Sequence, residues 1–212
     1  MKRLLQHLDR MSPLSPTYRT QDFLTHERDV SLRVAAEEHL LVLREELNME
    51  NGEICFRPIG VINTPHTDLS KMPIQPVYAG GIRGTVTVYT EYTEGLKDLD
   101  GFSHIYLLYW FHQVKDMKLT VTPYLDDSER GVFATRAPGR PNPIGLSLVK
   151  VLSIEKNVIY IEDVDMLDGT PLLDIKPFAP RFESREQVRS GWLDTVDERT
   201  ARIRGRRQDD KE

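Results

Sequence analysis

The feature that most constrains this chain is a succession of short apolar segments that fills its centre and is rich in Val, Ile, Tyr, Phe and Thr. These residue types suit the pleated, half-buried surface of a β-strand. Turn residues such as Lys156-Asn157 and Asp168-Gly169 separate the segments. No alternation of strands with long helices is visible, so the sequence predicts a mainly β fold, an antiparallel sheet or a small closed barrel. The segments read ICFRPIGVI, GTVTVYTEY, SHIYLLYWFH, RGVFATR, IGLSLVKVLSIE, NVIYIEDVDML and PLLDI.

The pattern inside the segments predicts how each strand is covered. GTVTVYTEY alternates, with Val86 and Val88 on one face and threonines on the other, which is typical of a strand with one buried face. SHIYLLYWFH, over 103–112, is apolar throughout, which predicts a strand covered on both faces. The stretch TEGLKDLDGF, over 93–102, has room for one short helix.

We expect three parts along the chain: an N-terminal helical extension (1–53), a single β-barrel domain (54–182) and an arginine-rich tail (183–212). In the extension, apolar residues recur every three or four positions over 31–47, which predicts an amphipathic helix. They are Leu32, Ala36, Leu40, Leu43 and Leu47. We expect this helix to pack on the main domain or on a second subunit, and a docking role is the alternative.

Composition limits the kinds of site and the location. A single cysteine, Cys55, excludes an intrachain disulfide and a cysteine-based zinc site. His104 and His112 would lie about 25 Å apart along an extended strand, so we expect structural histidines and no metal. No apolar run approaches the roughly 20 residues of a membrane span, and polar residues interrupt the start of the chain. We therefore expect a cytoplasmic protein without a membrane segment.

Charge limits the way in which nucleic acid can bind. The net charge is −5, which argues against a general polyanion binder. Residues 181–207, however, hold eight arginines against five acidic residues. RNA would therefore have to meet a local basic surface. A solvated tail is the alternative reading of the same residues.

The stretch FATRAPGRPNPIGLS, over 133–147, has the composition of a rigid binding loop. Its prolines fix the backbone and remove amide donors, and its glycines permit a close backbone approach. Arg136 and Arg140 offer planar charged groups that suit a carboxylate, a phosphate or a base. Asn142, held extended between two prolines, keeps its side-chain amide free to bind. A plain connection is the alternative.

A second candidate loop is DMLDGTPLLDIK, over 165–176, where a turn joins two predicted strands. Asp168 is placed either to cap that turn or to bind a ligand hydroxyl. Loops of this kind also occur as plain connections. Arginines in one loop and aspartates in the other, within one β domain, favour a shared binding site.

At these residues the chain resembles a known family. GVFATRAPGRPNPIGLS and VDMLDGTPLLDIKPF are similar to the two diagnostic stretches of the TrmO/TsaA-like family of tRNA methyltransferases, and the resemblance continues upstream through PIGVINTP. It covers residues 56 to about 182. The resemblance implies a small β-barrel that binds S-adenosylmethionine without a Rossmann fold and works as a homodimer. It also implies methylation of N6 of threonylcarbamoyladenosine, next to the tRNA anticodon.

The same resemblance implies a set of cofactor contacts drawn from four stretches of the chain. They are Pro73, Ile74, Gln75, His112, Gln113, Arg136, Leu146, Met166, Leu167, Asp168 and Gly169. Among the remaining loop residues, Arg140 and Asn142 are expected to contact the tRNA substrate.

The sequence names no catalytic residue. S-adenosylmethionine carries its own methyl group and leaving group, so the protein mainly has to position the reactants. The acceptor nitrogen must lose a proton, and Asp165, Asp168, His112 or water could accept it. Two other functions stay open: methyl transfer to another RNA or a small molecule, and a non-catalytic dimeric module that binds S-adenosylmethionine.

Overall fold

A computed structural model describes residues 49–50 and 53–207. The helix expected over 31–47 lies outside these residues. The chain forms two compact units, Met1–Cys55 and Phe56–Glu212. In the first unit, the described residues form two short antiparallel strands, β1 (Met49–Glu50) and β2 (Glu53–Ile54).

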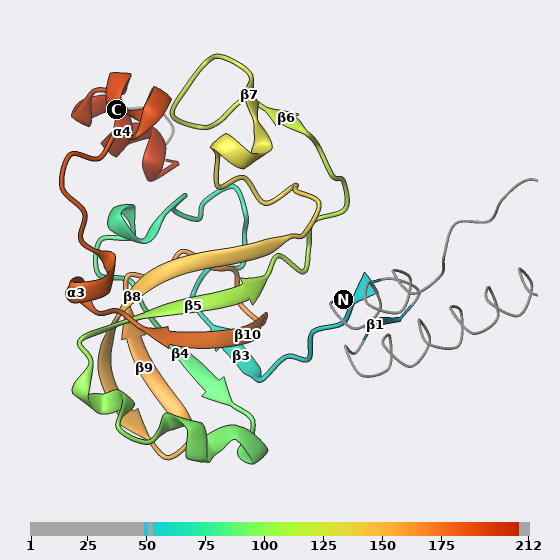
Figure 1. The fold of residues 1–212 in the computed structure, drawn as a ribbon, viewed down its shortest axis with the longest axis vertical. Helices are drawn as coiled ribbons and strands as arrows, with labels where there is room; N and C mark the ends of the chain where they lie inside the picture. The colour runs from blue at the N-terminus through green and yellow to red at the C-terminus, as the bar shows by residue number, and fades with distance from the viewer. Residues whose placement is uncertain (1–48, 51–52, 208–212) are drawn as a thin grey trace, which may run out of the picture. The chain divides into compact units, whose positions relative to one another are not determined.

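The second unit is built on a closed antiparallel barrel, which confirms the predicted mainly β fold (Figure 1). Each strand pairs with its neighbours in the order β10-β3-β4-β9-β8-β5, and β10 pairs with β5 to close the barrel. The strands are β3 (Gly60–Asn63), β4 (Arg83–Val88), β5 (His104–Trp110), β8 (Ile144–Glu155), β9 (Val158–Glu162) and β10 (Thr170–Pro177).

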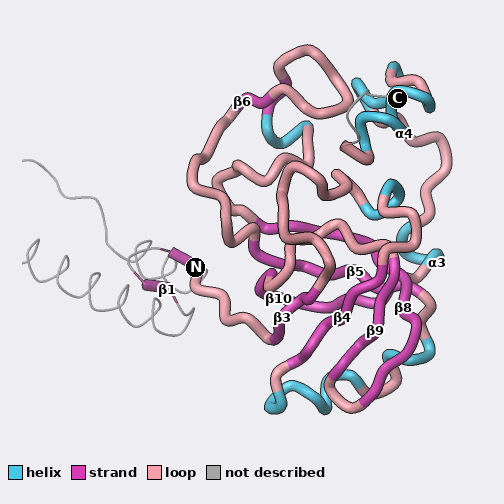
Figure 2. Tube along the Cα trace, turned by 180° about the vertical axis from the view of Figure 1, so that it is seen from behind, coloured by secondary structure: helices cyan, strands magenta, loops and turns pink. Residues whose placement is uncertain are grey.

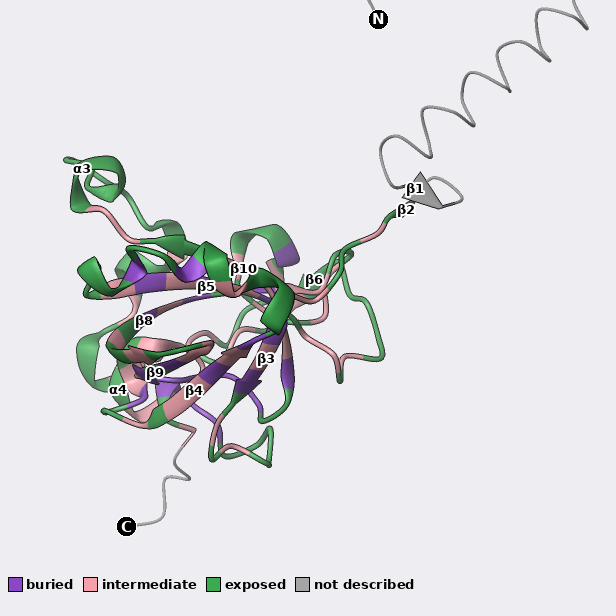
Figure 3. Ribbon diagram, turned by 90° about the horizontal axis from the view of Figure 1, so that it is seen from below, coloured by how far each residue is buried: buried purple, intermediate pink, exposed green. Residues whose placement is uncertain are grey.

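The core of the unit is the inside of the barrel, where alternate residues of the strands meet. Val86 and Val88 of β4 are buried, as their alternation with threonine predicts. Viewed from below, the barrel strands carry the buried residues while the helical segments are mostly exposed (Figure 3). The other large buried residues of the strands include Ile62, Ile105, Leu107, Val149, Ile159, Ile161 and Leu172.

The prediction that 103–112 is covered on both faces is wrong. In β5, Leu107 and Tyr109 face the core, whereas Leu108 is only half-buried and Trp110 is 47% exposed. An antiparallel barrel has an inside and an outside, so burial alternates along each strand. The continuous apolar run therefore gives β5 an apolar outer face.

The segment RGVFATR is not a barrel strand, contrary to expectation. Only β7 (Arg130–Gly131) is extended, and it pairs with β6 (Thr120–Val121) outside the barrel. The 3-10 turn η4 (Val132–Ala134) follows directly. This turn and the loop with three prolines that follows it end the extended segment at Gly131.

The remaining short elements are mostly helical turns. The helix expected over 93–102 is a pair of 3-10 segments, η2 (Thr90–Leu96) and η3 (Leu99–Gly101). The 3-10 turn η1 (Pro76–Tyr78) precedes β4. The C-terminal residues form α3 (Pro180–Glu183), η5 (Gly191–Thr195) and α4 (Glu198–Gly205). No helix in the described part of the chain is long and apolar enough to cross a membrane.

Strand polarity places both candidate loops at the same end of the barrel. Because the strands are antiparallel, 64–82, 111–143 and 163–169 all leave or enter the barrel at this end, here named the upper rim. In Figure 2 these loops gather above the strands. The opposite end, the lower rim, carries η2, η3 and the β8–β9 turn.

Candidate functional site

At the upper rim, Arg136 links the loop over 133–143, here named the proline loop, to the Pro73–Gln75 segment. The Nη1 atom of Arg136 donates a hydrogen bond of 2.6 Å to Oε1 of Gln75. The positive charge of Arg136 also acts on Asp165, the first residue of the bend over 165–169 (here named the acidic bend), where it opposes the rise in pKa that burial causes. Two stretches that lie far apart in the sequence therefore meet at one exposed guanidinium group, and the charge of that group acts on a third stretch.

Beneath this guanidinium lies a buried chain of three polar side chains, Tyr109, Ser147 and Asp165. The Ser147 hydroxyl donates to Oδ1 of Asp165 at 2.6 Å, and the Tyr109 hydroxyl lies 3.0 Å from Ser147 Oγ. A hydroxyl has one proton to give, so Tyr109 donates to Ser147 while Ser147 donates to Asp165. Neighbouring strands supply the two hydroxyls, since β5 carries Tyr109 and β8 carries Ser147.

Burial dominates the electrostatics of this chain. It raises the pKa of the Asp165 carboxyl from 3.8 to about 7, against the hydrogen bond from Ser147 and the charge of Arg136, which lower it. Burial and the neighbouring Asp165 charge also raise the pKa of Tyr109. Asp165 therefore changes charge near neutral pH, whereas Tyr109 stays protonated there and keeps its donor.

Asp168 holds the acidic bend in shape. Its Oδ1 accepts hydrogen bonds from the backbone N–H of Thr64 (3.0 Å) and from Nδ2 of Asn63 (3.3 Å), and its own N–H donates to the carbonyl of His66 (2.8 Å). Gly169 follows with φ +73°, a conformation that glycine adopts without strain. The expected turn exists, but β9 and β10 are not neighbours in the barrel, so the bend crosses the upper rim.

Two of the expected cofactor residues turn their side chains inward. Met166 is 1% exposed and Leu167 is 7% exposed, so both side chains belong to the core. Any contact with a ligand in the rim would be through their backbone. The carbonyl of Met166 already accepts a hydrogen bond of 2.8 Å from the Thr64 hydroxyl.

Arg140 organises the proline loop from within. Its Nη2 donates to the carbonyls of Thr135 (2.6 Å) and Val132 (3.3 Å), and its Nε donates to the carbonyl of Ala137 (2.9 Å). A loop with three prolines has few amide donors, so the guanidinium supplies donors that the backbone lacks. Asn142 is exposed at the surface. The expected contacts of Arg140 and Asn142 with substrate stay predictions.

The last expected residues lie on two sides of the rim. His112 and Gln113 are separated from the end of β5 by one residue, and the N–H of His112 donates to the carbonyl of Trp110 at 2.8 Å. Leu146 instead lies on β8 opposite Leu108 of β5, on the outer face of the barrel, and is 44% exposed. The upper rim therefore does not gather the whole predicted set on one face.

The C-terminal residues pack against this rim and form a strap, residues 191–207, that the sequence analysis missed. The carbonyl of Gly205 accepts a hydrogen bond of 2.9 Å from the N–H of Ile74, and the Tyr78 ring lies against Gly205. The indole N–H of Trp192 donates to the carbonyl of Ala134 at 2.8 Å. The strap thus contacts both the segment that carries Gln75 and the loop that carries Arg136.

Ion pairing adds to the docking of the strap. Arg204 makes a two-pronged contact with the Asp127 carboxylate, at 3.0 and 3.4 Å, and the guanidinium of Arg207 lies 4.3 Å from the centre of the Tyr124 ring. One sequence signal could have revealed α4. Aspartate is a preferred N-cap residue, and Asp197 stands just before the helix, where its side chain accepts from the N–H of Thr200 at 2.9 Å.

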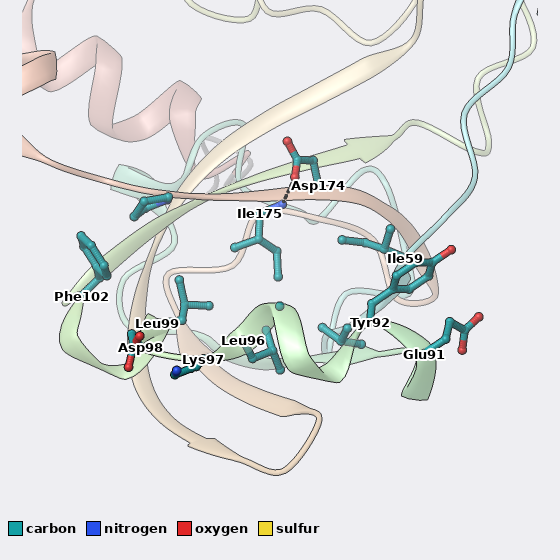
Figure 4. Close-up of a pocket in the computed structure, with 13 residues that line it drawn as sticks. Ile59, Glu91, Tyr92, Leu96, Lys97, Asp98, Leu99, Phe102, Asp174 and Ile175 are labelled. Carbon is teal, nitrogen blue, oxygen red and sulfur yellow. Dashed lines mark hydrogen bonds between the residues drawn. The ribbon is translucent and has the colours of Figure 1, made fainter. Parts of the chain in front are cut away.

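Among the described residues there is no metal site, and a cavity lies away from the upper rim. No group of three or more His, Cys, Asp or Glu side chains there is placed to hold a metal ion. A cavity of about 560 Å³ lies at the lower rim, between η2, η3 and β10, with Leu96, Leu99 and Ile175 in its wall (Figure 4). None of the predicted site residues lines it.

Comparison with known proteins relates this geometry to one family. The model of the tRNA-methyltransferase O N-terminal domain matches residues 61–184. A probable S-adenosyl-L-methionine-binding protein of Pyrococcus abyssi is 55% identical over 66% of this chain and 77% of its own length. Human tRNA (adenine(37)-N6)-methyltransferase is 32% identical over 66% of this chain and 33% of its own.

A solved structure, TrmO from Pseudomonas aeruginosa, superposes with a TM-score of 0.55 at 36% identity and covers 65% of this chain. The match spans 62% of that solved chain. The barrel, the two rim loops and the family model all fall in the same part of the sequence. The chain therefore belongs to the tRNA-methyltransferase O N-terminal domain family.

Proposed function

We propose that this protein is an S-adenosylmethionine-dependent tRNA methyltransferase whose cofactor binds at the upper rim. The observation that carries the proposal is the convergence of Gln75, Arg136 and the Asp165–Gly169 bend at one rim, in a chain of this family. The names of its relatives, an S-adenosyl-L-methionine-binding protein and a tRNA methyltransferase, support the same cofactor and substrate class.

The residues at the rim fit the chemical groups of this cofactor. Arg136 is exposed and offers a permanently charged fork for a carboxylate. Asp168 is exposed, and its Oδ2 can accept hydrogen bonds from ribose hydroxyls while Oδ1 keeps the bend in shape. S-adenosylmethionine supplies the electrophilic methyl group and its leaving group. The protein supplies position, which is worth about 7–11 kcal/mol of a barrier when two reactants are well aligned.

The finer substrate that we propose is N6 of threonylcarbamoyladenosine, beside the tRNA anticodon. The resemblance of the two loops to the family's diagnostic stretches supports it, and the human relative's name specifies N6 of adenine 37 in tRNA. The protein would act in the cytoplasm, where tRNA is modified and used.

We further propose a homodimer that completes the site. The outer face of β5 and β8 carries a continuous apolar stripe, named here the β5–β8 face: Tyr106, Leu108, Trp110, Ile144, Leu146 and Leu148. Trp110 and Leu146 are exposed and the other four are half-buried, and an apolar surface left open to solvent is typical of subunit contacts. Leu146, an expected cofactor contact, lies on this face and points away from the interior of its own barrel. A site shared between two protomers would bring it to the cofactor.

The decisive assay measures methyl transfer from isotopically labelled S-adenosylmethionine to tRNA that carries threonylcarbamoyladenosine. We expect label on the modified tRNA and none on unmodified tRNA. Label on the unmodified tRNA, or on another RNA or a small molecule, would favour a different acceptor. Tight cofactor binding with no turnover on bulk RNA would instead favour a non-catalytic module.

A further inference from the structure

The helix α4 at the end of the strap has two different faces. Ala201, Arg204 and Gly205 lie on the docking face: Gly205 is buried, and Arg204 binds Asp127. This face fixes α4 at the upper rim, because the carbonyl of Gly205 accepts from the N–H of Ile74. The docking face thus uses one of the five arginines at 199–207 to hold a carboxylate of the main unit.

The other face of α4 is basic and open to solvent. From 198 to 206, the exposed residues are Glu198, Arg199, Arg202 and Arg206. The three arginines are spaced three and four apart, so they share one side of the helix. Arg202 meets Glu198 at 3.8 Å, but both side chains are largely exposed, and such a pair contributes little and exchanges readily with other partners.

This basic face, formed by Arg199, Arg202 and Arg206, lies beside the candidate site. A hydrogen bond joins the Gly205 carbonyl of α4 to the N–H of Ile74, and the side chain of the next residue, Gln75, binds Arg136. The whole protein carries a net charge of −5, so its overall field repels a polyanion. A polyanionic substrate must therefore be held by a local surface, and this one is next to the proposed methyl donor.

We infer that the basic face of α4 binds the sugar-phosphate backbone of the substrate RNA on one side of the target base. This inference rests on the proposed function, because it presumes that the substrate at the upper rim is an RNA. Arginine forks match phosphate oxygens with two parallel hydrogen bonds, and a row of them along one helix face follows a strand of phosphates.

The test compares two double variants of the full chain. Arg199→Gln with Arg206→Gln removes two charges from the basic face, and Lys97→Gln with Lys156→Gln removes two charges from the lower rim. Binding to substrate tRNA is measured by fluorescence anisotropy across about 50 to 200 mM salt. Cofactor affinity is measured by calorimetry, and thermal unfolding checks that each variant keeps its fold.

We expect the slope of log affinity against log salt to become shallower by about one per arginine removed, with unchanged cofactor affinity. The lysine variant should keep the wild-type slope. A wild-type slope in the arginine variant, from a protein that does methylate tRNA, would overturn this inference and leave the proposed function standing. A wild-type protein that binds cofactor but neither binds nor methylates tRNA would overturn both.

Discussion

At the scale of single residues, Asp165 combines deep burial with a charge that is only partly compensated. Its pKa is raised from 3.8 to about 7 by burial, so the folded protein holds a proton that the unfolded chain has released. The stabilising contribution of this proton is fully present below about pH 4 and is lost as the pH rises to about 7. At most about 4 kcal/mol of unfolding free energy is at stake.

We predict that Asp165→Asn, a neutral mimic of the protonated carboxyl, flattens this pH dependence. The unfolding free energy is measured with urea from pH 4.5 to 8. Over this range it should fall less for the variant than for the wild type, and at pH 8 the variant should be at least as stable as the wild type. Asp68→Asn is the control, because hydrogen bonds from Ser70 lower the pKa of Asp68 and it titrates below this range. Equal slopes for Asp165→Asn and the wild type would contradict the prediction.

Arg136 binds Gln75 through a hydrogen bond, and its positive charge acts on the Asp165 carboxyl. We predict that Arg136→Ala weakens binding of S-adenosylmethionine about 10- to 100-fold, the loss of one charge-assisted hydrogen bond. Arg136→Lys should recover part of the affinity, because it restores the charge without the planar fork. Calorimetry that gives the wild-type affinity for Arg136→Ala would show that this guanidinium does not bind the cofactor.

At the scale of elements, the strap determines how the rim loops are held. It contacts Ile74 through Gly205, and Ala134 through Trp192, but it adds no strand to the barrel. We predict that a chain ending at Ser190 binds S-adenosylmethionine at least about tenfold more weakly, because Gln75 and Arg136 lose their support. Its barrel should still unfold cooperatively.

A point variant tests one hydrogen bond of the strap separately from the loss of the whole segment. Trp192→Phe removes the indole N–H that binds the Ala134 carbonyl but keeps an aromatic ring, so it should lower cofactor affinity by less than the truncation does. Calorimetry measures both. If the shortened chain binds the cofactor as tightly as the full chain while its tRNA affinity falls, the strap serves the RNA alone and does not support the rim.

The barrel elements were predictable where local pattern and tertiary position agree. The stretch IGLSLVKVLSIE predicts a strand, and β8 covers Ile144–Glu155, ending at the predicted turn. The stretch RGVFATR has similar propensity, yet Val132 lies in a 3-10 turn, where its carbonyl and that of Thr135 accept hydrogen bonds from the Arg140 guanidinium and none from a barrel strand of the described chain. Propensity describes a residue's fit to a pleated surface and does not tell whether such a surface is present.

The candidate site was predictable in its stretches but not in its individual contacts. Arg136 and Arg140 look equivalent in the sequence, and only the positions of the Val132, Thr135 and Ala137 carbonyls show that Arg140 serves the loop. The strap escaped prediction for a related reason. Its docking depends on single contacts, by Trp192, Arg204 and Gly205, which composition and periodicity do not reveal.

At the scale of the whole molecule, the β5–β8 face leads to a prediction about assembly. Specific interfaces bury about 800 Å² on each partner, and an apolar strand pair with an exposed Trp110 and Leu146 is a suitable centre for one. We predict that the wild type has the mass of a dimer by light scattering and that Leu146→Arg shifts it to a monomer. Leu152→Arg is the matched control, since Leu152 is on the same strand and is 38% exposed.

If two protomers share each cofactor site, loss of the dimer must also weaken cofactor binding. Trp110→Arg tests this, since Trp110 lies on the β5–β8 face but outside the expected set of cofactor contacts. If each protomer completes its partner's rim, Trp110→Arg lowers both the dimer fraction and the affinity for S-adenosylmethionine, and raising the protein concentration restores both together. A monomeric variant with full cofactor affinity would show that one rim suffices, and that Leu146 takes no part in binding.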